Sequence, residues 1–197
     1  MIVKPLLVLA VALPLVAQNM LAQNSGTCGR PFEATVSPGS QLTMDLRSGD
    51  VEVVGTSKPG VRVTCASGND AETRDVRIAF AAGHLRVYGG PDSAKHFHYR
   101  VEVPTATGLL VRCSAGNLTV SGIEGDKEIE LKAGNLVVEV GKPESYRVAE
   151  ASVMAGDLKA PAFGVTKDGL FRDFRKENAG GRYRLKAKVL AGNLTLR

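Results

Sequence analysis

The chain has 197 residues, with 25 Lys and Arg against 20 Asp and Glu, three cysteines, no tryptophan and a formal net charge of +5 at pH 7. That length is enough for one domain with a substantial hydrophobic core. Aromatic residues make up only 5% of the chain, which argues against proteins that stack sugars or bases on exposed aromatic platforms, such as carbohydrate-binding modules and single-strand nucleic-acid binders.

Residues 1–22 are expected to be a secretory signal peptide. A positive start that includes Lys4 precedes an apolar run at 6–16, and small residues follow at Ala17 and Ala22, which is typical of an exported precursor. The run is short for a membrane span, so no transmembrane anchor is expected. We predict a soluble product in the periplasm or outside the cell, with an N-terminal segment at 23–41 and a repeat-containing β domain at 42–197.

Six segments of the chain share one pattern. Two apolar residues in alternation precede a small residue and a glycine, then comes Asn, Asp or His, and then two more apolar residues in alternation. The glycines of the six segments are Gly49, Gly83, Gly116, Gly134, Gly156 and Gly192. The alternation predicts two short strands that share an apolar side. Gly followed by Asn or Asp predicts a tight turn between the strands with two positive φ angles.

The apolar residues keep the same places relative to each glycine, and we expect them to point into the core. Counting five and three residues before each glycine, and two and four after it, these are Met44, Leu46, Val51, Val53, Ile78, Phe80, Leu85, Val87, Val111, Cys113, Leu118, Val120, Ile129, Leu131, Leu136, Val138, Ala151, Val153, Leu158, Ala160, Ala187, Val189, Leu194 and Leu196.

The predicted architecture is all-β. The spacings between the glycines indicate a unit of roughly twenty residues with some copies eroded, which is the length of one solenoid rung. We therefore expect a β-solenoid-like stack of short strand-turn-strand repeats, although the uneven spacing argues slightly against it. A β-sandwich built from hairpins is the alternative, and the periodicity does not separate the two. Alternation also predicts strands at 97–103 and 183–189. Residues 161–181 are rich in Pro and Gly and are expected to be a loop-rich excursion.

Three cysteines in an exported chain leave at least one unpaired. Cys113 stands where other repeats carry Leu, Phe or Val, so we expect it to be a buried free thiol. Residues 63–69 resemble a weakened seventh repeat that places Cys65 inward. A disulfide between Cys28 and Cys65, which would pin the N-terminal segment, is therefore the favoured pairing, with Cys65 to Cys113 as the rival.

Positive charge is concentrated near the C-terminus. Residues 167–188 hold eight cations against three anions, and the alternation places four cations on one outward strand face, with three more on the preceding loop. Such a stripe could attract an anionic envelope polymer, a lipid surface or nucleic acid, and a glycan or a protein partner is also open. The candidate binding residues are Arg172, Arg175, Lys176, Arg182, Arg184, Lys186 and Lys188.

Two structural explanations of the same cations stay open. Lysines on an exposed strand also prevent edge-to-edge pairing with other sheets. Alternatively, the basic strand pairs with an acidic run if the two strands are neighbours. That acidic run comprises Glu124, Asp126, Glu128 and Glu130.

Metal and cofactor sites are not expected. His96 and His98 are two residues apart on a predicted strand, near Asp92 and His84 in the sequence, but no third ligand stands at a diagnostic interval. The chain lacks the motifs of serine hydrolases, zinc proteases, phosphate-binding loops and dinucleotide-binding folds. We therefore predict a protein that is not an enzyme.

The recurring motifs resemble a known family. Ser-Gly-Asp-Val-Glu-Val at 48–53, Ala-Gly-Asn-Leu-Thr-Val at 115–120, Ala-Gly-Asn-Leu-Val-Val at 133–138 and Ala-Gly-Asn-Leu-Thr-Leu at 191–196 resemble the putative-adhesin domains of exported bacterial proteins, of the DUF4097 type. The resemblance covers about residues 30–197. It implies a β-solenoid and an adhesin-like role, and it carries no catalytic residues.

The predicted function is an exported structural or interaction module that binds a component of the cell envelope or an extracellular surface. Nucleic acid is not an expected partner, because the chain is predicted to be exported. One alternative is a carbohydrate-active β-helix enzyme with Asp70, Asp75, Asp92 and Arg77 in a groove. Another is an envelope-stress or assembly accessory that binds a protein partner.

Overall fold

The computed structural model describes residues 24–66, 74–90, 97–167 and 170–197. The predicted signal peptide lies outside these residues, as do Asp70, Asp92 and His96. The strands are β1 (Asn24–Thr27), β2 (Phe32–Ala34), β3 (Gln41–Leu46), β4 (Gly49–Thr56), β5 (Val61–Ala66), β6 (Val76–Ala81), β7 (His84–Gly89), β8 (His98–Pro104), β9 (Gly108–Ser121), β10 (Lys127–Val138), β11 (Tyr146–Ala155), β12 (Leu158–Ala160), β13 (Val165–Lys167), β14 (Leu170–Glu177) and β15 (Tyr183–Leu196), and two 3₁₀ turns span Pro143–Ser145 and Pro161–Phe163. The predicted all-β class is confirmed.

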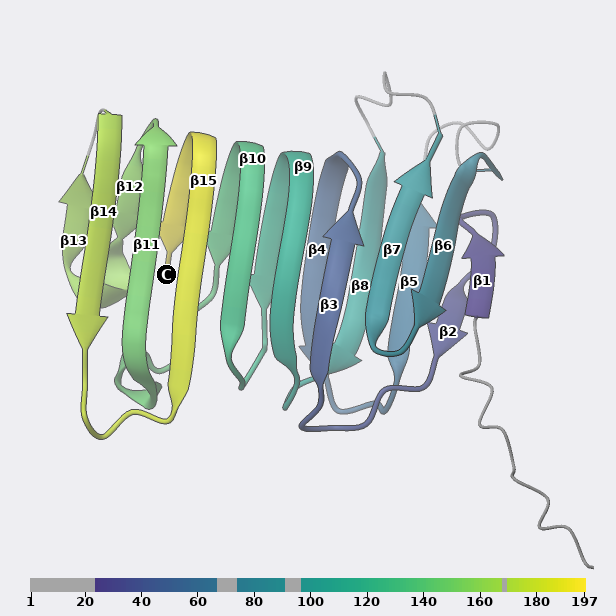
Figure 1. Cartoon of the computed structure of the whole chain (residues 1–197), viewed down its shortest axis with the longest axis horizontal. Coiled ribbons are helices and arrows are strands. Elements are labelled where there is room, and N and C mark those ends of the chain that lie inside the picture. The colour runs from purple at the N-terminus through teal and green to yellow at the C-terminus, as the bar shows by residue number, and fades with distance from the viewer. Residues whose placement is uncertain (1–23, 67–73, 91–96, 168–169) are drawn as a thin grey trace, which may run out of the picture.

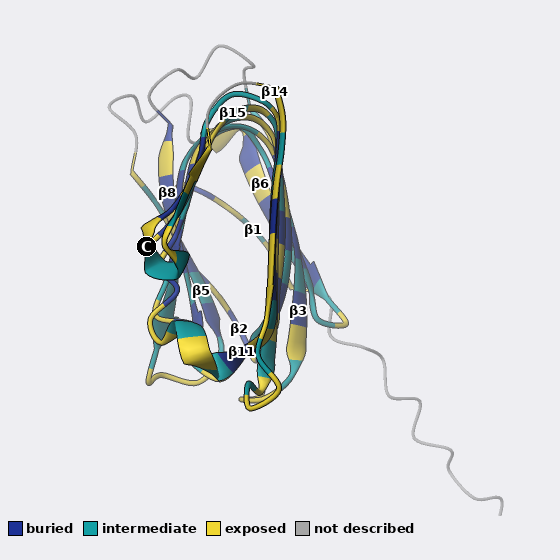
Figure 2. Ribbon diagram, turned by 90° about the vertical axis from the view of Figure 1, so that its left-hand side faces the viewer, coloured by how far each residue is buried: buried dark blue, intermediate teal, exposed yellow. Residues whose placement is uncertain are grey.

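The strands form two layers that meet along one long edge (Figures 1 and 2). The front layer has the order β1-β6-β7-β3-β9-β10-β15-β11-β14. The back layer contains β2, β5, β8 and β4 at one end and β12 and β13 at the other, as the off-path pairings show. The long strands β9, β10 and β15 bend at the shared edge, so that each belongs to both layers (Figure 2).

The hydrophobic core fills the space between the two layers. All of the 24 residues that the repeat pattern places inward are buried, which confirms the predicted phase of the alternation. Because β9, β10 and β15 are parallel and in register, equivalent residues of successive units stack directly on one another, as Leu118, Leu136 and Leu194 do. Each unit thus covers the apolar face of the next.

A column of five glycines forms the shared edge. In spatial order it consists of Gly49, Gly116, Gly134, Gly192 and Gly156, each with a positive φ between 111° and 149°. A Cβ atom added to Gly134 would overlap the carbonyl group of Gly116. The column therefore requires glycine for two reasons, the backbone angle and the close approach of the neighbouring strand.

The predicted two-residue turn is wrong at these five positions. Only the glycine has a positive φ, and the following Asn or Asp does not, so the chain bends from one layer into the other and does not reverse. At Gly83 a two-residue turn does form and closes the hairpin between β6 and β7, but its positive φ values belong to Ala82 (50°) and Gly83 (75°), and the following His84 has none.

The units do not stack in chain order. β15, the last strand, lies between β10 and β11 and is parallel to both. It matches β10 closely, since Ala133 to Leu136 lie opposite Ala191 to Leu194, residue for residue. A final strand with the same pattern as an earlier one is thus inserted in the middle of the sheet.

Residues 161–181 are not mainly a loop, which corrects the sequence-based expectation. They contain β13 and β14, and β14 forms the end of the front layer, antiparallel to β11. As an edge strand at the open end of the core, β14 buries only Phe174 among its eight residues. Its alternation is therefore too weak to identify from the sequence.

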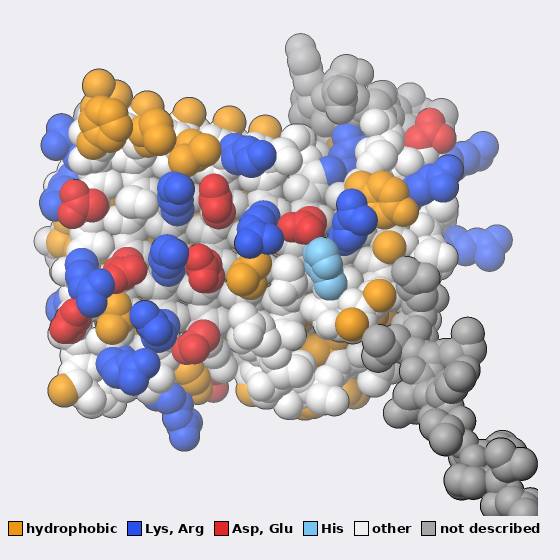
Figure 3. Space-filling view, in the orientation of Figure 1, with side chains coloured by type: hydrophobic (Ala, Val, Ile, Leu, Met, Phe, Trp, Pro, Cys, Tyr) orange, Lys and Arg blue, Asp and Glu red, His pale blue; other side chains and the backbone are white. Residues whose placement is uncertain are grey.

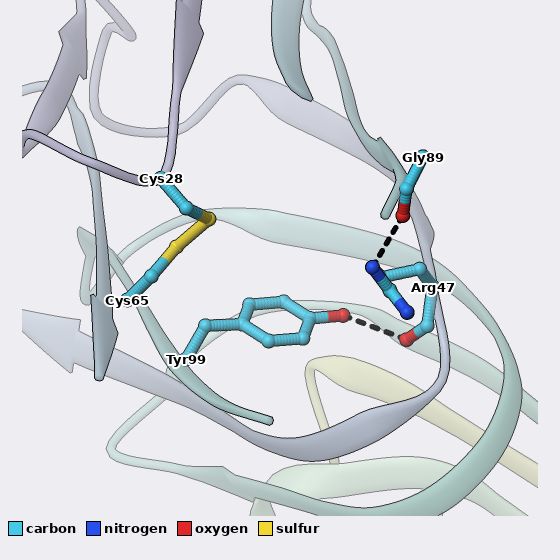
Figure 4. Close-up of a disulfide and its surroundings, with 5 residues drawn as sticks. All are labelled: Cys28, Arg47, Cys65, Gly89 and Tyr99. Carbon is cyan, nitrogen blue, oxygen red and sulfur yellow. Dashed lines mark hydrogen bonds between the residues drawn. A yellow bond between two sulfur atoms is a disulfide. The ribbon is translucent and has the colours of Figure 1, made fainter. Parts of the chain in front are cut away.

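The other end of the molecule carries a disulfide between Cys28 and Cys65, with 5.3 Å between the Cα atoms (Figure 4). It joins the segment between β1 and β2 to β5 in the back layer. Nearby, the hydroxyl group of Tyr99 donates a hydrogen bond of 2.8 Å to the carbonyl oxygen of Arg47. Cys113 is free and buried, and burial raises the pKa of its thiol to about 11, so this cysteine is a core residue.

Candidate binding surfaces

The basic strand is β15, and the acidic run lies beside it on β10 and in the turn before β10. Lys186 Nζ lies 2.9 Å from Glu128 Oε1, and Lys188 is aligned with Glu130. The hydrogen bond and the charge of Glu128 raise the pKa of Lys186. Two cations of the predicted stripe therefore face carboxylates across a strand pair, so β15 is not a bare row of positive charge.

The remaining two cations of the stripe, Arg184 on β15 and Arg182 just before this strand, differ in their surroundings. Arg184 is exposed, and its backbone N–H donates a 2.8 Å hydrogen bond to Asp126 Oδ1. Arg182 precedes β15, is exposed, and lies with its guanidinium 6.0 Å from the ring centroid of Tyr183. Glu124, the remaining member of the acidic run, lies in the turn before β10.

The other three candidate cations lie on β14. Arg175 is exposed and pairs with Glu150 and Glu177, which raise its pKa. Arg172 and Lys176 alternate with the buried Phe174 and so lie on the inward side of an edge strand. Charges that point inward at an edge strand oppose pairing with another sheet. The edge-protecting role that was open for residues 182–188 thus belongs to β14, because β15 is a central strand.

Positive charge still predominates at this end of the molecule. Residues 141–197, which include β11 to β15, hold 12 Lys and Arg against six Asp and Glu. Lys176, Arg182 and Lys188 are exposed, and among the described residues none of the three forms an ion pair. Over β14, β11 and β15, at the left end of Figure 3, blue Lys and Arg side chains alternate with red carboxylates. We call this region the positive end.

The back layer carries a ladder of amide side chains beside the glycine column. Asn193 Nδ2 donates to Asn135 Oδ1 at 2.8 Å, Asn135 Nδ2 to Asn117 Oδ1 at 2.8 Å, and Asn117 Nδ2 to Asp50 Oδ1 at 2.7 Å. At the other end of the row, the backbone N–H of Asp157 donates to Asn193 Oδ1 at 3.3 Å. These asparagines therefore link four strands through their side chains, whereas the sequence assigned them to turn geometry.

A shallow depression of about 420 Å³ adjoins the Asp50 end of this ladder. His98 Nδ1 lies 3.3 Å from Asp50 Oδ2, and Arg100 lies 3.3 Å from Glu52. Its full lining is Asp50, Val51, Glu52, Thr64, Ala66, His98, Tyr99, Arg100, Glu102, Asn117 and Thr119. The lining holds three carboxylates, those of Asp50, Glu52 and Glu102, against Arg100 and His98, so the depression is polar and its formal charge is negative.

The two histidines that the structure describes do not converge. His84 lies on β7 in the front layer, 2.8 Å from Asp45, whereas His98 lies on β8 in the back layer. Within the described residues, no cluster of three or more His, Cys, Asp or Glu side chains is placed to hold a metal ion. Asp75 and Arg77 lie at the start of β6, and the structure describes neither of the other two acidic residues proposed with them.

Lys127 is a buried lysine that the sequence reasoning missed. It is 2% exposed, and its Nζ donates to Tyr146 Oη at 2.6 Å and to the carbonyl oxygen of Gly125 at 3.1 Å. Burial lowers the pKa of Lys127 to about 8 and raises that of Tyr146 to about 12. The alternation contained a signal, because Lys127 is in phase with the inward residues Ile129 and Leu131.

In the part of the chain that the structure describes, no helix is both long and apolar enough to cross a bilayer. No protein-family model matches the sequence, and no curated protein matches it either.

Two solved structures resemble this chain. A "putative cell adhesion protein" from Clostridium sporogenes superposes with a TM-score of 0.52 over 85% of this chain and 98% of its own, at 9% sequence identity. A "putative adhesin" from Bacteroides fragilis covers 91% of this chain and 98% of its own at 9% identity, with a TM-score of 0.30. The likeness to the first structure shows a shared fold. The TM-score of the second structure is too low to carry an argument.

Proposed function

We propose that this chain is an exported, adhesin-like interaction module that binds an anionic component of the cell envelope or of an extracellular surface through its positive end. The observation that carries the proposal is the uneven charge distribution along the molecule. Cations outnumber anions two to one in residues 141–197, even though β15 lies beside the acidic strand β10. A local excess of one sign attracts a partner of the opposite sign and speeds their encounter.

The arrangement of the strands at the positive end supports such a role. The strands that carry the positive end are held by the glycine column and by the parallel register of β10, β15 and β11. Side chains on this frame recur at the spacing of neighbouring strands, about 4.8 Å. An ordered array of this kind suits an extended anionic surface better than a small molecule. The likeness in fold to a protein described as a cell adhesion protein agrees with this proposal.

The test is retention of the purified protein on envelope fractions over a series of salt concentrations. The informative variant replaces Lys176, Arg182 and Lys188 by Gln, because these exposed cations lack ion pairs within the described residues. Lys186 is left intact, since replacing it would leave Glu128 without its partner. We expect retention that weakens as salt rises and that falls about tenfold in the triple variant.

The matched control replaces three exposed cations at the opposite end, Arg30, Lys58 and Arg77, so that the change in net charge is the same. Its retention should remain close to that of the unmodified protein. Equal losses in both variants would show a net-charge effect, and salt-independent retention would point to a neutral glycan or a protein partner. Either result would contradict the proposal.

A further inference from the structure

A row of exposed apolar side chains crosses three neighbouring strands of the front layer. Phe171 of β14, Met154 of β11 and Leu190 of β15 stand at the same level of the sheet. The residues on either side of Phe171 and of Leu190 are aligned with Val153 and Ala155, the two neighbours of Met154. Phe171 is 74% exposed and Met154 48% exposed, and Leu190 is partly exposed. Adjacent strands are about 4.8 Å apart, so these three side chains form one continuous strip.

Leu170, which is 63% exposed, precedes Phe171 and adds a second large exposed apolar side chain at the same end of β14. We call Met154, Leu170, Phe171 and Leu190 the apolar rim. Hydrophobic side chains gather along the upper left edge of the space-filling view, over the upper ends of β14, β11 and β15 (Figure 3). A contiguous exposed patch of this kind marks a contact surface more often than do apolar residues scattered singly.

Phe171 combines two unfavourable features. Its large apolar side chain is exposed, and its φ of 51° lies in the left-handed region that non-glycine residues rarely adopt. Apart from it, Ala82 is the only non-glycine residue with a positive φ within the described part of the chain. A strained residue that presents an aromatic ring to solvent contributes nothing evident to packing, which favours a role in binding.

The surroundings of the rim decide what kind of partner fits. On β10, Lys132 continues the row, because it lies between Leu131 and Ala133, which are aligned with Val189 and Ala191. Lys132 is exposed. The rim also belongs to the positive end, so a partner must offer both an apolar interior and an anionic surface. A bilayer that contains anionic lipids has both properties.

We propose that the apolar rim inserts into the interfacial region of an anionic lipid bilayer while the surrounding cations contact its headgroups. This inference rests on the proposed function, because it assigns the anionic component to a lipid surface. Aromatic and aliphatic side chains on a rigid edge enter the headgroup region, and the cations remain at the level of the lipid phosphates.

The chain has no tryptophan, so a Phe171→Trp variant carries a single fluorescent reporter at the rim. Its emission is recorded with vesicles of phosphatidylcholine alone and with vesicles that also contain phosphatidylglycerol. Tyr88→Trp is the matched control, because Tyr88 is 41% exposed on β7, away from the rim. We expect a blue shift for the rim reporter with anionic vesicles only, and no shift for the control.

A second measurement is the partition of the unmodified protein onto anionic vesicles. Replacing Leu170 and Phe171 together by Ser should lower that partition about a hundredfold, since each large side chain contributes about tenfold when buried. The Tyr88→Ser variant should bind like the unmodified protein. Circular dichroism verifies that every variant is folded.

Three outcomes would overturn the inference. One is a rim reporter that does not respond to anionic vesicles, and another is a control reporter that responds equally. The third is a dimer in solution that the double Ser variant at Leu170 and Phe171 abolishes, because the rim would then join two copies of the chain. Salt-sensitive binding to a soluble polyanion without vesicle binding would leave the proposed function intact and remove only the lipid assignment.

Discussion

At the residue scale, the glycines of the shared edge serve two purposes that substitution can separate. Gly134 combines a φ of 122° with a backbone contact that leaves no room for a Cβ atom. We expect Gly134→Ala to lower the free energy of unfolding by more than about 4 kcal/mol, or to prevent folding, because the strand backbones would have to move apart. Urea denaturation followed by circular dichroism measures the loss.

The control for this substitution is Gly39→Ala. Gly39 also has a positive φ, of 80°, but nothing lies within 4 Å of an added Cβ atom. Backbone strain alone should cost about 1–2 kcal/mol there. If both variants lost the same free energy, the close approach of the strands would be irrelevant and the interpretation of the glycine column would be wrong.

Lys127 gives the protein a pH dependence of its own. Its pKa is lowered to about 8 by burial, against about 10.4 in an unfolded chain. Between these values the unfolded chain holds a proton that the folded chain has released, so stability rises with pH across this window. The penalty of charging Lys127 in the folded state is then about 3 kcal/mol below pH 8.

The measurement compares the unmodified protein with Lys127→Met by urea denaturation between pH 7.5 and 9.5. We expect the unmodified protein to gain about 1 kcal/mol more per pH unit than the variant. The raised pKa of Cys113 opposes this gain as pH rises, but Cys113 is present in both proteins, so its effect cancels in the difference. Parallel pH profiles would show that burial does not lower the pKa of Lys127.

At the element scale, the amide ladder ties β4, β9, β10 and β15 together on the back layer. Asn135 both donates to Asn117 and accepts from Asn193. Asn135→Ala removes both hydrogen bonds at an exposed site and should lower the free energy of unfolding by about 1–2 kcal/mol. Chemical denaturation of the variant checks this value.

Thr195→Ala is the companion variant for the ladder. Thr195 lies on the same face of β15 as Asn193, and no side-chain hydrogen bond involves it among the described residues. Its replacement should change stability by no more than about 0.5 kcal/mol. Equal effects at the two positions would mean that the ladder contributes nothing beyond ordinary surface packing.

β14 illustrates why an edge element is difficult to identify from sequence. A central strand of this fold buries every second residue, as β15 does at Leu185, Ala187 and Val189. β14 has the core on one side of only part of its length and buries Phe174 alone. The sequence therefore suggests that its cations lie on a charged loop, although they lie on the edge strand at the end of the front layer.

At the scale of the whole molecule, the insertion of β15 couples the C-terminus to the centre of the fold. β15 pairs with both β10 and β11 in the front layer, and with β12 in the back layer. A chain that ends at Gly181 should therefore lose cooperative unfolding, because β11 to β14 would have no sheet to join. Thermal unfolding and limited proteolysis together measure the loss.

A chain that begins at Cys28 is the control for this truncation. It lacks only β1, which pairs with β6 alone at the opposite end of the front layer. It should retain a single cooperative transition at a modestly lower temperature. If the C-terminal truncation unfolded just as cooperatively, β15 would be an appendage and not a central strand.

Much of the fold could be read from the chain because side-chain alternation and glycine placement are local properties. A residue's phase relative to the nearest glycine decides whether it faces the core, as the buried positions of Met44, Leu118 and Leu196 show. The same reasoning identified the all-β class. It also favoured the cysteine pair that the structure joins, Cys28 and Cys65.

Only the tertiary structure decided which strands are neighbours, and the candidate site depends on that. β10 and β15 lie far apart in sequence, and their pairing sets Glu128 beside Lys186. The same long-range order brings Phe171, Met154 and Leu190 into one row. Every unit carries nearly the same pattern. The pattern by itself therefore indicates that the units stack, but it does not indicate the order in which they stack. The order follows from packing and chain connection over the whole molecule, which no local segment contains.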